Sequence, residues 1–123
     1  MLKAMRIEII EFESKGRGAY DVTPLIREKV KECLEGLAIV SVLSPLTSII
    51  TIEYEPALLS DLEKLLEKIP SKNSFIKNSV FSKSLVIPII EGEPELGSFQ
   101  QIVLLDLNSD KGTRKIAVGV IKQ

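Results

Sequence analysis

The chain has 123 residues, of which 45% are hydrophobic and 27% charged, and its formal net charge is -1. This length fits a single domain spanning residues 1–123, and the apolar content suffices for a core without disulfides or metal. The absence of histidine excludes Ser-His-Asp and Cys-His triads, HExxH zinc sites and zinc fingers, and the near-zero charge argues against a nucleic-acid partner.

The first third of the chain predicts a strand followed by a helix. Residues 6–13 alternate apolar and polar side chains with a period near two, which is typical of a half-buried strand. Thr23 is placed to cap a helix, and Pro24 fits its first position. Gly36 is expected to end this helix. Its apolar stripe consists of Ile26, Val30, Cys33, Leu34 and Leu37.

The middle of the chain predicts two strands and a second helix. Residues 37–43 are β-branched and almost wholly apolar, as in a central strand covered on both faces, and residues 48–54 form another β-rich run. Residues 56–69 carry a leucine face opposite charged side chains, which predicts an amphipathic helix that ends at Pro70.

The last part of the chain predicts a surface loop and three strands. Residues 71–83 are rich in Ser, Asn and Lys, which favours a surface loop with at most a short helical turn. The strands are expected at residues 84–90, 100–107 and 113–121. Because the paired strands have connections too short for parallel crossovers, the expected class is α+β. Its architecture is a mostly antiparallel, β-sandwich-like sheet with two main helices packed on one face.

Cysteine usage and the lack of long apolar runs bear on the cellular environment. Cys33 is the only cysteine, so no internal disulfide can form, which fits the reducing cytoplasm. The start of the chain, MLKAMRIEII, is interrupted by charges, and no apolar run reaches the ~18 residues of a spanning helix. We therefore expect a soluble, cytoplasmic protein with no signal peptide and no membrane partner.

Four features could carry chemistry, and each has a plainer interpretation that is favoured. Cys33 lies on an apolar stripe, where a thiol is usually a small buried hydrophobe. Residues 16–18, Gly-Arg-Gly, could offer amides to an anion or form a strand-end turn. Residues 91–97, EGEPELG, match no ordered calcium loop. Glu53 and Glu55 could act as an acid/base pair, but paired surface carboxylates are commoner.

The segment of residues 71–83 is the only locally basic, hydroxyl-rich stretch of the chain. It carries Lys72, Lys77 and Lys83 among four serines, and such a segment can bind a phosphate or carboxylate. The alternative is an ordinary solvated loop. Composition and spacing alone therefore lead only to a soluble α+β domain.

Motifs in the second half of the chain add a resemblance. Residues 75–89 read FIKNSVFSKSLVIPI and residues 97–100 read GSFQ. They resemble the H-[LI]-K-x-S-x-x-G-x-S-L-x-[IL]-P-[VI] and G-T-W-Q motifs of the YjbQ-like family, also called secondary thiamine-phosphate synthases. Residues 17–23, RGAYDVT, and 112–115, GTRK, are similar to the family's R-G-F segment and its Arg-rich final hairpin. The resemblance covers nearly the whole chain in order.

This resemblance implies a homotrimer of an α+β sandwich, with an active site lined by histidines near the subunit interface. The histidine positions fall on Pro45 and Phe75, which removes metal ligands and proton carriers, and Phe75 is expected to make the pocket drier. Acidic positions of the family fall on Tyr54 and Asp106. No catalytic residue and no metal ligand is assigned. The residues implied to bind a ligand are Thr47, Lys77, Ser98, Gln100 and Arg114.

Three functions follow from these observations. The favoured one is a diverged homotrimer that has lost the histidine-based site, needs no cofactor and binds a small phosphate or carboxylate or acts through its assembly. The first alternative is residual Mg-dependent thiamine-phosphate synthase activity, which would join a pyrimidine pyrophosphate to a thiazole phosphate, with Arg114 and Lys77 steadying the phosphates. The second alternative is a structural subunit that partners an active relative in a mixed trimer.

Overall fold

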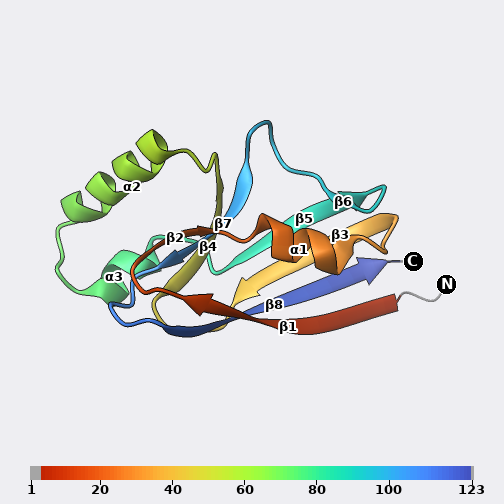
Figure 1. Cartoon of the computed structure of the whole chain (residues 1–123), viewed down its shortest axis with the longest axis horizontal. Helices are drawn as coiled ribbons and strands as arrows, with labels where there is room; N and C mark the ends of the chain where they lie inside the picture. Colours follow the sequence, from red (N-terminus) through yellow and green to blue (C-terminus); the bar gives the residue numbers. More distant parts are fainter. Residues whose placement is uncertain (1–3, 123) are drawn as a thin grey trace.

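Two antiparallel sheets pack against each other in the computed structural model, which describes residues 4–122 (Figure 1). The five-stranded sheet has the order β1-β8-β3-β5-β6, and the three-stranded sheet has the order β2-β7-β4. The elements are β1 (Ala4–Ser14), β2 (Gly18–Asp21), α1 (Thr23–Val30), β3 (Glu35–Val42), β4 (Thr47–Ile52), α2 (Pro56–Lys68), α3 (Ser74–Ser79), β5 (Ser84–Ile90), β6 (Glu93–Pro94), β7 (Gln101–Asp106) and β8 (Gly112–Lys122).

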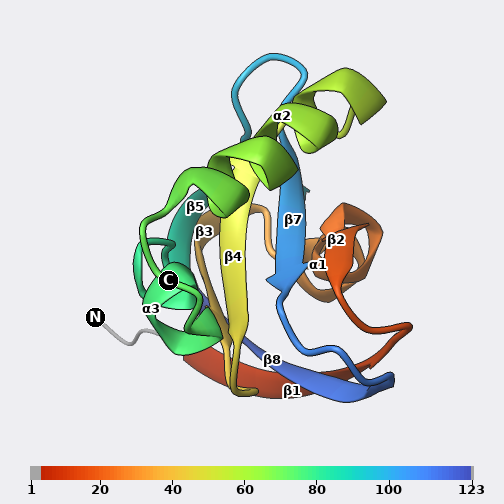
Figure 2. The ribbon, with the colours of Figure 1, turned by 90° about the vertical axis from the view of Figure 1, so that its left-hand side faces the viewer.

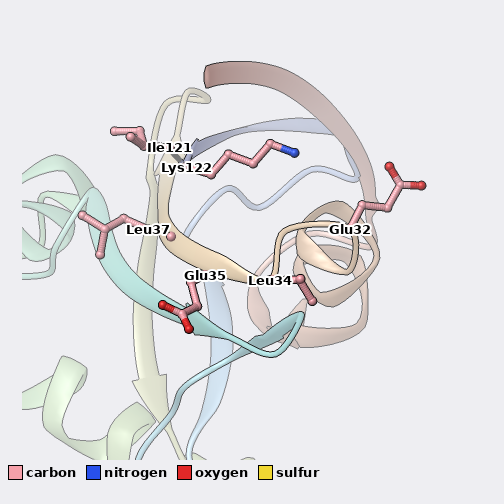
Figure 3. A pocket seen from close by; sticks show the side chains of 7 residues that line it. Glu32, Leu34, Glu35, Leu37, Ile121 and Lys122 are labelled. Carbon is pink, nitrogen blue, oxygen red and sulfur yellow. The ribbon is translucent and has the colours of Figure 1, made fainter. Parts of the chain in front are cut away.

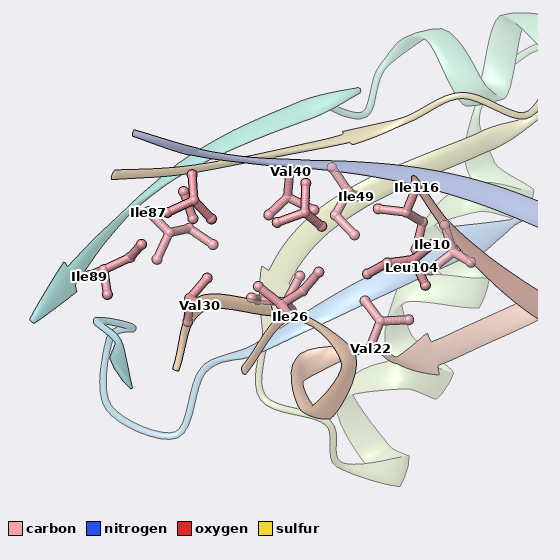
Figure 4. Close-up of a cluster of buried hydrophobic side chains, with 14 of the residues drawn as sticks. Ile10, Val22, Ile26, Val30, Val40, Ile49, Ile87, Ile89, Leu104 and Ile116 are labelled. Atoms are coloured by element: carbon pink, nitrogen blue, oxygen red, sulfur yellow. The ribbon is translucent and has the colours of Figure 1, made fainter. Parts of the chain in front are cut away.

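The core lies between the two sheets and is closed on one side by α1 (Figure 4). Strand periodicity builds it, because alternate residues of each strand face inward. In register, Ile10 of β1 lies opposite Ile116 of β8, and both are buried. Ile26 and Val30 of α1 are fully buried in the same cluster. This confirms the expected α+β class with mostly antiparallel pairing.

The two main helices lie on opposite faces of the three-stranded sheet. Ile26 and Val30 of α1 pack in the core with Leu104 of β7. Helix α2 instead lies across the other face, in front of β4 and β7 in Figure 2, and its Leu66 lines a cavity with Leu105 of β7. Neighbouring strand residues point to opposite faces, so Leu104 lies on the α1 side of the sheet and Leu105 on the α2 side. The expected packing of both helices on one face therefore does not describe this arrangement.

The first helix is shorter than expected, and its cap differs. It ends at Val30, and Thr23 is its first residue, with Asp21 accepting the Thr23 N–H at 2.9 Å. Gly36 lies in β3 and does not act as a helix stop. A side chain there would place Cβ 2.2 Å from the Ile121 carbonyl oxygen, so glycine is needed for the close approach of β8. The apolar spacing of residues 33–37 thus belongs to a turn and a strand.

The rest of the chain follows the expected order, with two short strands in addition. β5 has the expected bounds of residues 84–90, and β4, α2, β7 and β8 differ by one or two residues at their ends. The expected loop at residues 71–83 contains the short helix α3. The sequence did not predict β2 or β6. None of the helices within residues 4–122 is long and apolar enough to cross a membrane.

β3 is central in the five-stranded sheet, as expected, but it is not covered on both faces. Its Ala38 and Val40 are buried, whereas Leu37 is 43% exposed on the opposite face. We call this opposite face of the five-stranded sheet the outer face. Its exposed large apolar residues on β1, β3 and β5 are Met5, Ile7, Ile9, Leu37, Val86 and Ile90.

Candidate functional site

The candidate site is a polar hollow of about 520 Å³ where the β3–β4 turn, the start of α3 and the β7–β8 loop meet. We call it the arginine hollow. The β3–β4 turn and the β7–β8 loop meet there because β4 and β7 are paired as far as Thr47 and Asp106, and Arg17 adds a further side chain. Its lining residues are Arg17, Leu46, Ser74, Leu107, Asn108, Ser109, Asp110 and Arg114.

A buried ion pair forms the base of the arginine hollow. Arg114 Nε lies 2.7 Å from Oδ2 of Asp106, whose side chain is fully buried. Ser14 Oγ donates to the same oxygen at 2.6 Å, and the backbone N–H and side-chain amide of Asn108 donate to Oδ1 at 2.9 and 2.8 Å. Four donors thus hold the carboxylate, which compensates its loss of hydration. The Asp106 charge is neutralised within the protein.

The same contacts fix the orientation of the Arg114 guanidinium. Its Nη2 donates to the backbone carbonyl of Asp110, in addition to the Nε contact with Asp106. Among residues 4–122, Nη1 has no hydrogen-bond acceptor. A guanidinium offers planar, paired donors, so its remaining N–H groups suit an oxyanion.

The β3–β4 turn supplies the opposite wall of the hollow under backbone strain. Leu46 has a φ of 59°, a left-handed conformation that is unusual for a branched side chain. Its carbonyl accepts the Leu107 N–H at 2.9 Å, and the Pro45 carbonyl accepts from Asn108 Nδ2 at 2.9 Å. These bonds tie the turn to the end of β7 and hold the strained conformation.

The residues implied by the resemblance do not form one site. Arg114 lines the arginine hollow, and Thr47 is its neighbour in space, because Thr47 lies opposite Asp106 in register. However, Thr47 is only 1% exposed, and its Oγ1 donates to the Ser44 carbonyl at 2.6 Å, so it stabilises the turn. Lys77 is half-buried in α3 and is not among the lining residues, although Ser74 of the same helix is.

Ser98 and Gln100 lie at the other end of β7. Both precede Gln101, where this strand begins, whereas Asp106 ends it. At ~3.4 Å per residue, the strand separates its two ends by about 17 Å. Ser98 and Gln100 therefore cannot bind the same small anion as Arg114 within one chain.

Pro45 and Phe75, the positions that the resemblance assigns to the family's histidines, flank the arginine hollow without closing it. Both are exposed in the single chain, Phe75 to 64%, while their neighbours Leu46 and Ser74 line the hollow. Phe75 is therefore not part of the lining of this hollow, and its expected drying effect on a pocket at a subunit interface stays a prediction. Ser74 instead contributes a hydroxyl to the lining.

A second polar cluster behind β4 was not predicted from the sequence. Lys83 Nζ donates to Ser48 Oγ at 3.0 Å and to the carbonyls of Asn78 and Phe81 at 2.7 and 3.0 Å. The Asn78 amide is satisfied when its Nδ2 faces Ser48 Oγ at 2.6 Å. Burial lowers the pKa of Lys83 from its ordinary value. The Lys83 head group thus secures the end of α3.

The weaker candidates have structural roles or lie apart from one another. Cys33 is 3% exposed and belongs to the core, as expected. Glu55 accepts the Leu58 N–H at 3.1 Å and caps α2, and Glu93 pairs with Arg27 at 2.9 Å. Within residues 4–122, no group of three or more His, Cys, Asp or Glu side chains could hold a metal ion.

A larger surface hollow, of about 680 Å³, lies at the end of the five-stranded sheet where β3 begins and β8 ends. Figure 3 shows that its side chains extend in different directions instead of converging. Its charged groups are Glu32 and Glu35, around the start of β3, and Lys122 at the end of β8. We therefore assign the candidate site to the smaller arginine hollow, where cationic and hydroxyl groups meet over a neutralised ion pair.

Known proteins share both sequence and fold with this chain. A family model described as UPF0047 protein YjbQ-like matches residues 8–123. A UPF0047 protein of Archaeoglobus fulgidus is 25% identical over 94% of this chain and 92% of its own length.

Two solved structures extend the comparison to the fold. A YjbQ/UPF0047-family protein of Clostridium acetobutylicum, described as uncharacterised, has a TM-score of 0.78 at 26% identity, over 90% of this chain and 98% of its own. A protein of unknown function from Sulfolobus solfataricus P2 has a TM-score of 0.84 at 20% identity, over 98% of this chain and 100% of its own. The second likeness concerns the fold alone.

Proposed function

The chain belongs to the YjbQ-like UPF0047 family, and from that premise we propose that it is a homotrimer that binds a small phosphate or carboxylate without histidine-based catalysis. The observation that carries this proposal is the apolar outer face of the five-stranded sheet. A protein whose sequence has no histidine lacks the usual proton carrier near neutral pH. Assembly and binding are then the functions that its surfaces support best.

The outer face is apolar across four neighbouring strands. One row of residues in register crosses it, and this row consists of Ile7, Gly119, Ile39 and Val86. Residues directly opposite each other in antiparallel strands share a face. Ile7 and Val86 at the ends of the row are 62% and 63% exposed. Contiguous exposed apolar surface of this kind marks a site of protein association.

We propose that further copies of this chain cover the outer face. Gly119 is buried between Ile7 and Ile39, so the side chains of these two isoleucines form the surface of the outer face there. Glu11 lies opposite Lys115 beyond this row, so opposite charges occur together on the same face. A surface that is apolar and carries both positive and negative charges beside the apolar row can complement itself.

The assembly is tested by measuring molar mass with light scattering after size-exclusion chromatography. We expect three times the chain mass of 13.6 kDa. The double variant Ile7→Lys/Val86→Lys should yield folded monomers, because lysine ammonium groups cannot be buried unpaired at an interface. Leu65→Lys serves as the control, since Leu65 is 55% exposed on α2 and away from the outer face. A monomeric wild-type protein would overturn the trimer.

The arginine hollow supports the anion-binding part of the proposal. Arg17 provides a cation, the Nη1 of Arg114 provides N–H donors, and Ser74 and Ser109 provide hydroxyl donors. The Asp110 carboxylate lines the same hollow and opposes an anion by its charge. We therefore expect opposite changes in anion affinity: a decrease when a cation of the hollow is removed, and an increase when this carboxylate is removed.

Calorimetric titration with inorganic phosphate tests the anion site. Arg17→Gln should weaken binding and Asp110→Asn should tighten it, each by about twofold to fivefold for partly exposed charges. Lys111→Gln is the control, since Lys111 is exposed next to Asp110 but does not line the hollow. Absence of phosphate binding, or changes that follow net charge alone in all three variants, would reject the site.

The enzyme alternative makes a different prediction. Incubation with the pyrimidine pyrophosphate, the thiazole phosphate and Mg²⁺ should give no thiamine phosphate if the chain only binds anions. Turnover by the purified protein that disappears in Arg114→Ala would replace our proposal with residual synthase activity. Co-purification of a histidine-containing relative at fixed ratio would instead favour a structural subunit of a mixed trimer.

A further inference from the structure

A second, largely apolar cavity of about 150 Å³ lies beneath α2, next to the arginine hollow. We call it the leucine cavity. It lies between α2 on one side and β2 and β7 on the other. Helix α2 packs incompletely on this sheet, since Leu66 is its only buried residue. Its lining residues are Arg17, Gly18, Ala19, Leu59, Leu62, Glu63, Leu66, Leu105, Asp106 and Leu107.

The size and lining of the leucine cavity suit a small apolar group. An apolar cavity of about 150 Å³ is large enough to accept a molecule such as benzene. Here five leucines and Ala19 supply most of the wall. The buried Asp106 carboxylate does not disturb this environment, because Arg114 and three further hydrogen bonds satisfy it.

Arg17 lines both the leucine cavity and the arginine hollow. Its Nη2 lies 3.0 Å from Glu63 Oε1, and the two side chains are 39% and 49% exposed. An ion pair this exposed contributes little free energy, so an anionic ligand can take the place of the Glu63 carboxylate. Arg17 is thus a cation at the border between an apolar and a polar compartment.

We infer that the leucine cavity and the arginine hollow form one site for a small amphipathic anion. The apolar body, about the size of a benzene ring, lies under α2, and its phosphate or carboxylate pairs with Arg17 in place of Glu63. This inference rests on the proposed anion binding, because Arg17 belongs to both compartments. It adds the chemical class of the ligand: an oxyanion joined to an apolar group.

Binding of phenyl phosphate, benzoate and inorganic phosphate to the intact protein tests the inference. We expect phenyl phosphate to bind at least tenfold more tightly than inorganic phosphate, since a buried phenyl group adds hydrophobic free energy. Benzoate distinguishes a carboxylate site from a phosphate site. Glu63→Gln should tighten all three ligands, because it frees Arg17.

Matched variants locate the apolar body. Ala19 lies opposite Leu105 in register, so a larger side chain there fills the leucine cavity. Ala19→Leu should therefore remove the advantage of phenyl phosphate and leave the affinity for inorganic phosphate unchanged. Ala57→Leu makes the same substitution at an exposed position of α2 that does not line the cavity. It should leave both affinities unchanged.

Nuclear Overhauser contacts between the phenyl protons and the methyl groups of Leu59 and Leu62 provide a test that needs no variant. If inorganic phosphate binds but phenyl phosphate binds no more tightly, the amphipathic site is wrong while the anion site stands. If neither binds, both proposals fail. If phenyl phosphate binds tightly but shows no contacts to these methyl groups, the apolar body lies elsewhere and the inference is overturned.

Discussion

Arg114 Nε lies 2.7 Å from Asp106 Oδ2 in the interior between the end of β7 and the start of β8. Only 10% of the arginine side chain and none of the aspartate side chain is exposed. Such a pair contributes modestly as a pair, but either member alone is a buried charge without its counter-charge. The pair therefore specifies how the β7–β8 loop closes, and with it the floor of the arginine hollow.

Replacing one member of this ion pair should destabilise the protein more than replacing both members together. Asp106→Leu or Arg114→Met alone should lower the free energy of unfolding by about 3–5 kcal/mol, because each leaves one buried charge. The double variant should lose less free energy of unfolding than the sum of the two single losses. Urea unfolding checks both expectations, and Arg27→Met, from the exposed pair with Glu93, should cost about 1 kcal/mol or less. Additive losses would contradict the coupling.

Gly36 should tolerate no side chain, because β8 passes too close to it. A Cβ at this position would lie 2.2 Å from the Ile121 carbonyl oxygen and 2.9 Å from Cys33 Sγ. Gly36→Ala should therefore destabilise the protein by about 1–3 kcal/mol through forced displacement of β3 and β8. Gly18→Ala is the matched control, since its nearest contacts would be with the Tyr20 side chain, at 3.4 Å from the hydroxyl and beyond. Equal melting temperatures for the two variants would contradict this account.

The sequence predicted most of the fold because each long element carries a local pattern. The leucine face of residues 56–69 and the apolar runs of β5, β7 and β8 are properties of single segments. The end of α1 is different, because Cys33 and Leu34 continue the helical spacing by chance. After Val30 the chain turns into β3, and the pairing of β3 with β5 and β8 joins segments that are far apart in the chain.

The site was predicted only in part, for a similar reason. The resemblance named both Arg114 and Thr47, which the pairing of β4 with β7 brings near each other, but it could not show at which end of β7 a motif lies. Ser98 and Gln100 precede that strand and Asp106 ends it, so one strand length separates them. Arg17 was noted only as a neighbour of two glycines. Its role depends on α2 folding back over β2, which no local pattern encodes.

Lys83 should give the stability a measurable pH dependence in alkaline solution. Burial lowers the pKa of its ammonium group in the folded protein below the ordinary value of 10.5. Between the two pKa values the unfolded chain binds more protons, so the free energy of unfolding rises with pH across this interval and levels off above about 10.5. Urea unfolding at increasing pH measures the slope.

Two variants separate Lys83 from the other lysines. Lys83→Gln should flatten the rise, because the group with the lowered pKa is gone. Lys31→Gln should not flatten it, because the hydrogen bond that Lys31 donates to the Glu28 carboxylate raises the pKa of Lys31 instead. Direct titration of the Lys83 side chain by heteronuclear NMR gives an independent result, and a midpoint at or above 10.5 would contradict the effect of burial.

Helix α2 should unfold locally before the sheets do. Only Leu66 of this helix is buried, and the cavity beneath it reduces the packing that holds it. Leu66→Ala should therefore raise hydrogen exchange throughout α2 while the amides of β3 and β8 remain protected. Leu65→Ala removes the same number of atoms from a side chain that is 55% exposed, so it should change the exchange of α2 little. If Leu66→Ala instead raised exchange equally in α2 and in β8, α2 would be part of the cooperative core.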